Sequence, residues 1–229
     1  MIIFIGIFLL IIFYVIVVEI RNRKLLHTVT FSNRGTRSER SLVLTLLKSG
    51  VPAITIFHDL YLKNNNGKYS QIDLVVATKV GLIVFEVKEY SGWIFGTGNQ
   101  PKWTQILAFG KRKYQFYNPI LQNNKHISDL KNQVKQFEYL QFYSIVVFYG
   151  DCKFKDVSFI PKGTYLIKSN RVKEVMRMIQ TENPPANYTN KREVLSVLNE
   201  AVKTGENKQI QIQHIANVED MLGHHRIFE

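Results

Sequence analysis

The sequence predicts an α/β fold, a mixed central sheet flanked by helices, preceded by one N-terminal transmembrane helix. Short runs of β-branched and aromatic residues alternate along the chain with stretches whose apolar residues recur at helical spacing. Strands and helices that alternate in this way pack as layers around a common core. The first eighteen residues carry no charged side chain, which separates them from the basic remainder of the chain.

Residues 1–18 have the composition of a transmembrane signal anchor. At about 1.5 Å of rise per residue, this run is near the minimum for crossing a hydrocarbon core of about 30 Å. Residues 19–32 form a basic juxtamembrane connector. The positive-inside rule therefore predicts a single-pass protein of the cell membrane whose C-terminal domain is cytoplasmic. A cleaved signal peptide is the alternative, but the run lacks both a charged start and a small-residue cleavage site.

All of the net charge of +12 lies on the part of the chain that follows the apolar run. A basic surface suits nucleic acid, because lysine and arginine neutralise phosphates and release counterions. It also suits the anionic inner leaflet of a membrane, which attracts the basic residues of the connector. The candidate nucleic-acid contact is a basic cluster beside several aromatic residues, namely Lys111, Arg112 and Lys113. The alternative for this cluster is an ordinary solvated face.

The first helix of the predicted domain spans residues 39–48. Its apolar residues recur three and four positions apart, Ser38 is its candidate N-cap, and Gly-Val-Pro at 50–52 ends it. A strand is expected over residues 53–62. The sequence Asn-Asn-Asn-Gly at 64–67 predicts a turn that leads into the next strand.

Two apolar runs joined by a short glycine-containing link, 74–77 and 82–88, predict an antiparallel hairpin. If the turn centres on the middle of the link, Asp73 lies directly opposite Glu86. Lys88 shares the face of Glu86, because side chains alternate along a strand. The two carboxylates and the lysine then converge at the open end of the hairpin, whereas a one-residue slip would separate the carboxylates.

Two carboxylates held close together are costly unless a proton or a cation lies between them. A hard divalent ion such as Mg²⁺ accepts one or two carboxylates and keeps several waters. Such an ion activates a water molecule and neutralises charge that develops on a phosphate, while a neighbouring lysine positions that water. The cluster therefore favours metal-dependent phosphodiester cleavage. The alternative is that these charges are ordinary solvated residues at strand ends.

The chain after the hairpin continues with further elements. Residues 92–98 contain three glycines and are expected to form a bend. Pro119 begins a helix that is expected to run to Val134, and Gln122 and His126 share one of its faces because they are four residues apart. The remaining periodicities predict strands at 144–149, 157–160 and 164–168 and helices at 171–180 and 190–203.

The end of the chain is less defined by its pattern. The segment from residue 206 is either an edge strand or a packing helix, since the spacing of its isoleucines suits both. Cys152 is the single cysteine, and one cysteine forms no internal disulfide, which agrees with a reducing cytoplasm.

Several short motifs occur in a fixed order along the chain. They are Gly-Thr-Arg-Ser-Glu at 35–39, His-Asp-Leu at 58–60, Gln-Ile-Asp at 71–73, Glu-Val-Lys at 86–88, Ser-Gly-Trp at 91–93, Trp-Thr-Gln at 103–105 and Asn-Pro-Ile-Leu-Gln-Asn at 118–123, followed by His126. In this order they resemble the nuclease-related domain (NERD) of the PD-(D/E)xK nuclease superfamily. We therefore predict a NERD nuclease-like domain over residues 33–180 and a helical C-terminal extension over residues 187–229.

The resemblance implies a restriction-endonuclease-like core with a metal site on the hairpin. Asp73 and Glu86 would bind Mg²⁺ (or Mn²⁺), with the carbonyl of Val87 as a third ligand. Lys88 would orient or activate the attacking water. Glu39 matches an acidic residue that often completes such sites.

The resemblance also marks polar residues outside the hairpin. Gln105 matches a polar residue on a later element that approaches the same centre. Gln71 is placed to support Asp73 through hydrogen bonds. Gln122 and His126 match motif positions on the long helix, where they either contact substrate or brace the hairpin.

These observations predict a membrane-anchored, Mg²⁺-dependent nuclease that hydrolyses phosphodiester bonds in nucleic acid. DNA is the favoured substrate. A second hypothesis is a module of the same fold that tethers nucleic acid or a protein at the membrane without cutting. A third is a basic membrane-surface protein with no nucleic-acid role. The intact Glu-x-Lys motif favours the enzyme.

Overall fold

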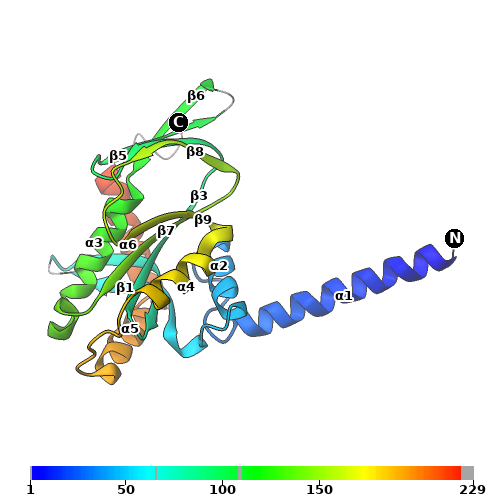
Figure 1. Cartoon of the computed structure of the whole chain (residues 1–229), viewed down its shortest axis with the longest axis horizontal. Coiled ribbons are helices and arrows are strands. Elements are labelled where there is room, and N and C mark those ends of the chain that lie inside the picture. Colours follow the sequence, from blue (N-terminus) through cyan, green and yellow to red (C-terminus); the bar gives the residue numbers. More distant parts are fainter. Residues whose placement is uncertain (1, 65, 108–109, 223–229) are drawn as a thin grey trace.

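The structure is a computed structural model that describes residues 2–64, 66–107 and 110–222. Helix α1 (Ile2–Leu26) projects away from the body that the rest of the chain forms (Figure 1). Within the described residues, Phe4–Leu26 is the one segment long and apolar enough to cross a membrane, and its apolar window is not buried against the body. A membrane span and a signal sequence share this length and composition.

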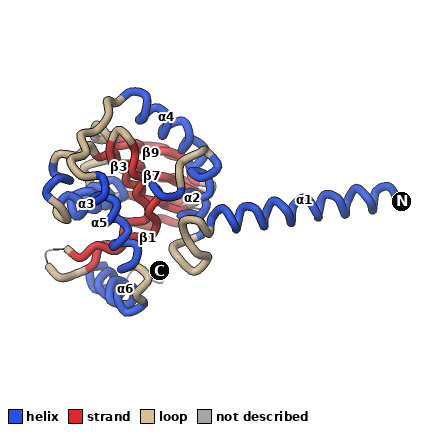
Figure 2. The backbone as a smooth tube through the Cα atoms, turned by 90° about the horizontal axis from the view of Figure 1, so that it is seen from below, coloured by secondary structure: helices blue, strands red, loops and turns tan. Residues whose placement is uncertain are grey.

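Five strands form a mixed sheet at the centre of the body (Figure 2). They are β1 (Ile56–Lys63), β2 (Tyr69–Thr78), β3 (Gly81–Glu89), β7 (Phe142–Tyr149) and β9 (Thr164–Lys168), which lie in that order. The first three pair antiparallel, whereas β3, β7 and β9 pair parallel. The predicted mixed sheet is therefore confirmed. The first strand begins later than expected, because Ala53–Thr55 forms a 3₁₀ turn.

Four strands form a second, smaller sheet that the sequence pattern did not predict. They are β4 (Gly92–Thr97), β5 (Lys102–Leu107), β6 (Arg112–Tyr117) and β8 (Cys152–Ser158), and the order in the sheet is β6-β5-β4-β8. The bend expected at 92–98 is wrong, since this segment is strand β4. A Cβ on Gly96 would lie 2.3 Å from the Trp103 ring, so this glycine serves close packing and not a bend.

The strand expected at 157–160 is placed wrongly, because β8 lies mostly before it. Strand β8 alternates polar and apolar residues, which makes its apolar signal weak. It ends at Ser158, and the next residue, Phe159, has a φ of 54° in the left-handed region that a strand does not use.

Helices cover both faces of the central sheet (Figure 2). Helices α2 (Arg37–Lys48) and α4 (Val172–Glu182) share one buried cluster with one sheet face. Helices α3 (Pro119–Lys131) and α5 (Lys191–Thr204) share a second cluster with the opposite face. Helix α5 thus belongs to the same core as the sheet. The segment after residue 206, for which a strand and a helix were both expected, forms the last helix, α6 (Lys208–Leu222). This helix lies beside β2.

Two helix ends differ from the sequence prediction. The N-cap of α2 is Thr36 and not Ser38, because Thr36 and Glu39 form a capping box in which each side chain binds the other residue's backbone N–H. The Ser38 hydroxyl instead donates to the Glu89 carboxylate. Helix α3 ends at Lys131, before the expected Val134, and a 3₁₀ turn at Lys135–Glu138 follows.

Candidate functional site

The hairpin of β2 and β3 has the predicted register. Leu74 pairs with Phe85 and Thr78 pairs with Gly81, which confirms a turn centred on the middle of the link. The described ladder ends at Leu74 and Phe85, and the same register continued by one position sets Asp73 opposite Glu86. The backbone N–H of Val87 donates to Asp73 Oδ2 at 2.7 Å, so the two strand ends are held together beyond the last regular pair.

The alternation of side chains between the two sheet faces inverts in β1 and in β2 at the same level of the sheet. At this level Asp59 is opposite Asp73, and these two residues form no regular ladder pair, whereas the residues on either side of them do. On β2, Leu74 packs with α2 and α4 whereas Ile72 packs with α3 and α5, although residues two apart on a regular strand share a face. On β1, Asp59 has a φ of 57°, in the left-handed region. The inversion places Asp73 between the two helical layers.

Glu86 is the most deeply buried acid of the site, with 1% of its surface exposed. Its Oε1 lies 2.6 Å from Lys88 Nζ, and its Oε2 lies 3.3 Å from Nε2 of His126 on α3. Burial raises the pKa of the Glu86 carboxyl, but Lys88 and His126 outweigh burial and hold this pKa below its usual value. Glu86 is therefore an ionised, buried carboxylate.

Lys88 is held by a second contact from the same helix. Its Nζ donates to Gln122 Oε1 at 3.1 Å, so α3 contacts Glu86 through His126 and Lys88 through Gln122. Burial lowers the pKa of the Lys88 ammonium, but the negative charges of Glu86 and Asp73 outweigh it and raise this pKa above its usual value. The pair of helical residues four apart therefore braces the Glu-x-Lys segment.

Asp73 has the opposite electrostatic behaviour. Burial raises the pKa of its carboxyl well above 3.8, and the negative charges of Glu86 and Glu39 raise it further, against the opposing effect of Lys88. The charged form of this carboxyl is therefore disfavoured unless a further cation compensates its charge. The site thus combines one buried ionised carboxylate with a neighbour that favours a proton or a positive ion.

Glu39 reaches the site from the first turn of α2. Its Oε1 accepts hydrogen bonds from the Thr36 hydroxyl at 2.7 Å and the Thr36 backbone N–H at 3.2 Å. Its Oε2 lies 3.3 Å from His58 Nε2 on β1. Burial raises the pKa of the Glu39 carboxyl, but His58 and Thr36 outweigh burial and lower it.

Two carboxylate–histidine–hydroxyl chains therefore converge on the site from opposite layers. In one, His126 Nδ1 lies 3.2 Å from Ser70 Oγ and its Nε2 faces Glu86. In the other, His58 Nδ1 lies 2.8 Å from Thr30 Oγ1 and its Nε2 faces Glu39. In both, the carboxylate Oε2 and the ring Nε2 lie 3.3 Å apart, within ion-pair distance.

His58 received no role from the sequence, although it lies in one of the motifs. The available signal was a polar residue inside an apolar strand that is buried along nearly its whole length. Buried histidines are rarely without partners, so the position itself indicated a polar contact. The partners were not readable, because Thr30 and Glu39 come from other elements.

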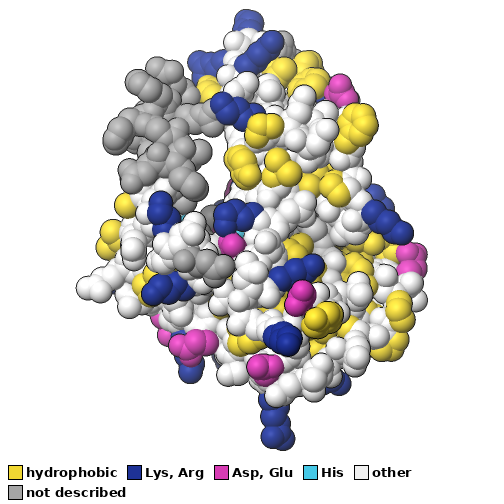
Figure 3. All heavy atoms as spheres, turned by 90° about the vertical axis from the view of Figure 1, so that its left-hand side faces the viewer, with side chains coloured by type: hydrophobic (Ala, Val, Ile, Leu, Met, Phe, Trp, Pro, Cys, Tyr) yellow, Lys and Arg dark blue, Asp and Glu magenta, His cyan; other side chains and the backbone are white. Residues whose placement is uncertain are grey.

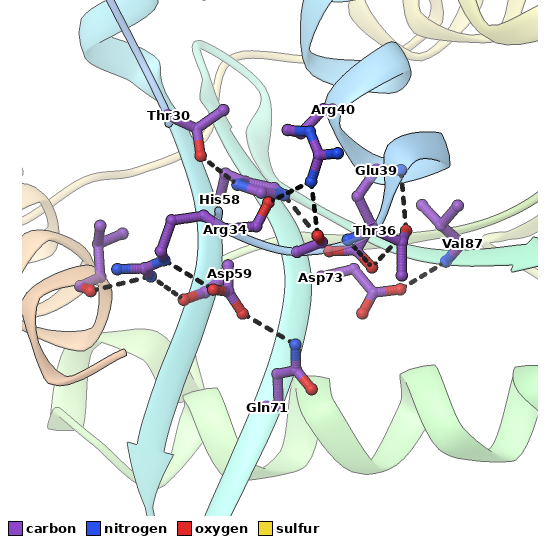
Figure 4. A network of polar contacts seen from close by, with 12 residues as sticks. Thr30, Arg34, Thr36, Glu39, Arg40, His58, Asp59, Gln71, Asp73 and Val87 are labelled. Carbon is purple, nitrogen blue, oxygen red and sulfur yellow. Dashed lines mark hydrogen bonds and ion pairs between the residues drawn. The ribbon is translucent and has the colours of Figure 1, made fainter. Parts of the chain in front are cut away.

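Around these chains lies an outer network that joins distant segments (Figure 4). Arg34 donates to Asp59 Oδ2 and to the Asp59 carbonyl, each at 2.7 Å, and to the Val202 carbonyl of α5 at 3.2 Å. Gln71 Nε2 donates to Asp59 Oδ1 at 2.8 Å. Gln71 was expected to support Asp73 and contacts Asp59 instead, because the inversion at Asp59 turns this carboxylate toward it.

Comparison with known proteins agrees with this arrangement. Residues 34–149, just over half of the chain, match the model of the nuclease-related domain. The chain belongs to the NERD family. It is also 29% identical over 137 residues to an uncharacterized protein of Bacillus anthracis, a match that covers 60% of this chain and 63% of that protein. No solved structure matches the chain.

The matched NERD segment contains every candidate catalytic residue. It begins at Arg34 and ends at the last residue of β7, so it includes α2, the hairpin, α3 and the first strands of the second sheet. Strand β9 and helices α4 and α5 lie beyond it, yet they complete the two buried clusters. The NERD fold of this chain therefore depends on residues outside the matched segment.

The remaining predicted site residues lie on the second sheet. Gln105 on β5 is nearly buried and donates to the Ser91 carbonyl at 2.8 Å, just after β3. Lys111, Arg112 and Lys113 are exposed at the start of β6. Among the described contacts, none joins these four residues to the carboxylates, and their roles stay predictions.

The donor atoms of the site suit a hard divalent ion. Within the described part of the chain, no group of three or more His, Cys, Asp or Glu side chains is arranged to hold a metal. The expected set has only two carboxylates, Asp73 and Glu86, and a backbone carbonyl. Mg²⁺ is commonly held by one or two carboxylates and retains its waters, so a set of this size fits it.

Proposed function

We propose that this protein is a membrane-anchored, divalent-metal-dependent nuclease that hydrolyses phosphodiester bonds in DNA on the cytoplasmic face of the membrane. The observation that carries the proposal is the convergence of Asp73, Glu86 and Lys88 at the end of one hairpin. Each is held by a separate contact, from the backbone N–H of Val87, from His126 and from Gln122 respectively. A fold that only tethers a partner has no need of a buried, braced acid–lysine pair.

Asp73, Glu86 and the Val87 carbonyl are the residues that would hold the ion, with Mg²⁺ or Mn²⁺ as candidates. Residues of a strand direct their N–H and C=O to the same neighbour. Because the Val87 N–H reaches Asp73, its carbonyl faces the same side. A bound divalent ion neutralises the carboxylates and the charge that develops on the phosphate. The raised pKa of Asp73 supports a cation at this position.

Lys88 is the residue proposed to serve the attacking water. An ammonium group has three N–H donors, of which one faces Glu86 and one Gln122 in the described structure. The third is available to hold a water molecule or to stabilise negative charge on the phosphate. Glu39 is the proposed acceptor for a hydrogen bond from this water, because its charge acts on the neighbouring Asp73.

The charge of the chain supports a nucleic-acid substrate, of which DNA is the form we propose. The chain carries a net charge of +12, and phosphate contacts dominate the affinity of proteins for nucleic acid. Figure 3 shows lysine and arginine side chains spread over one face of the body, with acidic side chains among them. The exposed residues at the start of β6 add to this basic surface: Lys111, Arg112 and Lys113.

The test uses the full chain in detergent with labelled plasmid and labelled single-stranded DNA. Cleavage is compared in Mg²⁺, Mn²⁺ and EDTA for the wild type, Asp73→Asn, Lys88→Ala and the control Lys173→Ala, an exposed lysine on α4. We expect metal-dependent cutting that both site variants lose and the control keeps. Cutting that survives in both site variants would assign the activity elsewhere.

The alternative function is a tether without catalysis. It would be favoured by absence of cutting together with retention on DNA that weakens between about 50 and 200 mM salt. Retention on anionic vesicles with none on DNA would instead favour a membrane-surface protein.

A further inference from the structure

A groove of about 520 Å³ lies where helix α1 meets the end of helix α2. It is remote from the carboxylates along α2, because Glu39 lies in the first turn of that helix and Lys48 in the last. The groove is lined by Val18, Arg21, Asn22, Lys24, Leu25 and Lys48.

One face of α1 forms most of the groove. Val18, Arg21, Asn22 and Leu25 are spaced three and four residues apart, which puts them on a single stripe of the helix. The stripe carries apolar residues at Val18 and Leu25 and polar residues between them. Such a surface suits a ligand with a charged head and an apolar body.

Three cations of the groove are without an acidic partner in the part of the chain that the structure describes. These are Arg21, Lys24 and Lys48, none of which forms an ion pair there. Arg23, between the first two along the helix, differs because it pairs with Glu19 at 3.0 Å. The helix dipole favours a cation near a helix C-terminus and so accounts for Lys24 and Lys48 singly, but not for their joint position around one groove.

The position of the groove decides the class of ligand. If α1 crosses the membrane, as the proposed function holds, the apolar run ends at Val18 and Arg21 lies one turn below it, at the level of the lipid headgroups. The inner leaflet is anionic, and basic residues at this depth attract its phosphates. Nucleic acid would bring phosphates but no apolar body to fit Val18 and Leu25.

We propose that this groove binds the phosphate headgroup of an anionic phospholipid, with Arg21, Lys24 and Lys48 around the phosphate and Val18 beside the acyl chain. Lys48 distinguishes this site from diffuse attraction to the membrane, because it comes from the NERD domain and not from the juxtamembrane helix. A lipid in the groove therefore contacts α1 and α2 together and fixes the domain against the membrane.

The test measures phosphatidylglycerol and phosphatidylcholine retained by the full chain in native mass spectrometry, after release from nanodiscs that contain both lipids. Lys48→Gln and Arg23→Gln each remove one positive charge. We expect Lys48→Gln to lower retained phosphatidylglycerol about fivefold, the factor for one basic residue near an anionic headgroup. Arg23→Gln should lower it by less, because Arg23 pairs with Glu19 and does not line the groove.

Four results would overturn the proposal. Equal losses in the two variants would mean diffuse attraction, and equal retention of the two lipids would mean that no anionic headgroup is selected. Displacement of the lipid by millimolar glycerol phosphate would mean a site for free phosphate. If the full chain fails to stay in nanodiscs, the anchor of the proposed function fails and the lipid site fails with it. Loss of lipid selectivity with intact DNA cleavage would leave the nuclease proposal standing.

Discussion

His126 Nε2 lies 3.3 Å from Glu86 Oε2, and the other ring nitrogen lies 3.2 Å from the hydroxyl of Ser70. This places an α3 side chain directly behind a carboxylate that the hairpin carries. Partners that orient a ligating carboxylate typically affect metal affinity or activity by about 10- to 100-fold when they are removed. We therefore propose that His126 acts as a positioning residue for Glu86.

We predict that His126→Gln lowers cleavage by about 10- to 100-fold and raises the Mg²⁺ concentration needed for half-maximal activity. The measurement is a Mg²⁺ titration of plasmid cleavage by the full chain. Lys125→Gln, which changes the preceding residue on the same helix, is the control and should keep its metal requirement. An unchanged titration curve for His126→Gln would show that Glu86 does not need this support.

Gly35 offers a test of the contacts that join Glu39, His58 and Thr30. It has a φ of 58°, and a Cβ there would lie 2.3 Å from Glu39 Oε2 and 2.6 Å from His58 Nε2. Gly35→Ala should therefore displace both side chains and reduce cleavage at least tenfold. The matched control is Gly163→Ala, at a φ of 80° with nothing within 4 Å of the added Cβ.

Both alanine variants should lose about 1 kcal/mol of unfolding free energy from the left-handed conformation. Only Gly35→Ala should lose activity beyond this stability effect. Chemical denaturation and cleavage assays on the same preparations separate the two quantities. Similar activity in the two variants would show that Glu39 and His58 do not act in the site.

The hairpin was the part of the site that the sequence predicted best. A short turn fixes the register of an antiparallel pair, so the opposition of Asp73 and Glu86 followed from local information alone. The spacing of Gln122 and His126 predicted that they share one face of the helix. It did not predict that this face contacts Lys88 and Glu86.

The second sheet and the outer network were not predictable for physical reasons. Glycines mark bends and also close packing, and Gly96 serves the second purpose against Trp103. The contact of Arg34 with the Val202 carbonyl joins residues 168 positions apart. The strand inversion at Asp59 lies beside these contacts, and no local periodicity encodes it.

Asp73→Asn should abolish cleavage and yet stabilise the metal-free protein. The folded state raises the pKa of this carboxyl above 3.8, so the folded protein binds the proton more tightly than the unfolded chain does. Stability attributable to Asp73 is therefore lost as the pH rises from about 4 toward the folded pKa. The neutral amide avoids this loss.

Thermal unfolding in EDTA should show a higher Tm for Asp73→Asn than for the wild type at pH 7, with a smaller difference near pH 4. A chain of this size shifts its Tm by about 2–4 °C per kcal/mol. Addition of Mg²⁺ should raise the Tm of the wild type and not of the variant. A lower Tm for the variant at pH 7 would contradict the unfavourable charge of Asp73.

The basic start of β6 should contribute to DNA affinity and not to chemistry. We predict that Arg112→Gln with Lys113→Gln raises KM for DNA and reduces the slope of log affinity against log salt by about 2, while kcat is kept. Fluorescence anisotropy with catalytically inactive Asp73→Asn protein measures the slope. A fall in kcat with unchanged affinity would place these residues in the active site instead.

Arg34 and Asp59 form a buried ion pair at the strand inversion, at 2.7 Å and with both side chains less than a tenth exposed. Arg34→Met should lower the unfolding free energy by about 3–5 kcal/mol, because it leaves the Asp59 carboxylate buried without a counter-charge. Asp59→Asn added to it should recover most of that stability. Because the double variant still lacks the arginine that joins β1 to α5, cleavage should stay low after stability returns. Denaturant unfolding and cleavage of the wild type, Arg34→Met, Asp59→Asn and the double variant measure the coupling. Recovery of both quantities together would show that the pair serves stability alone.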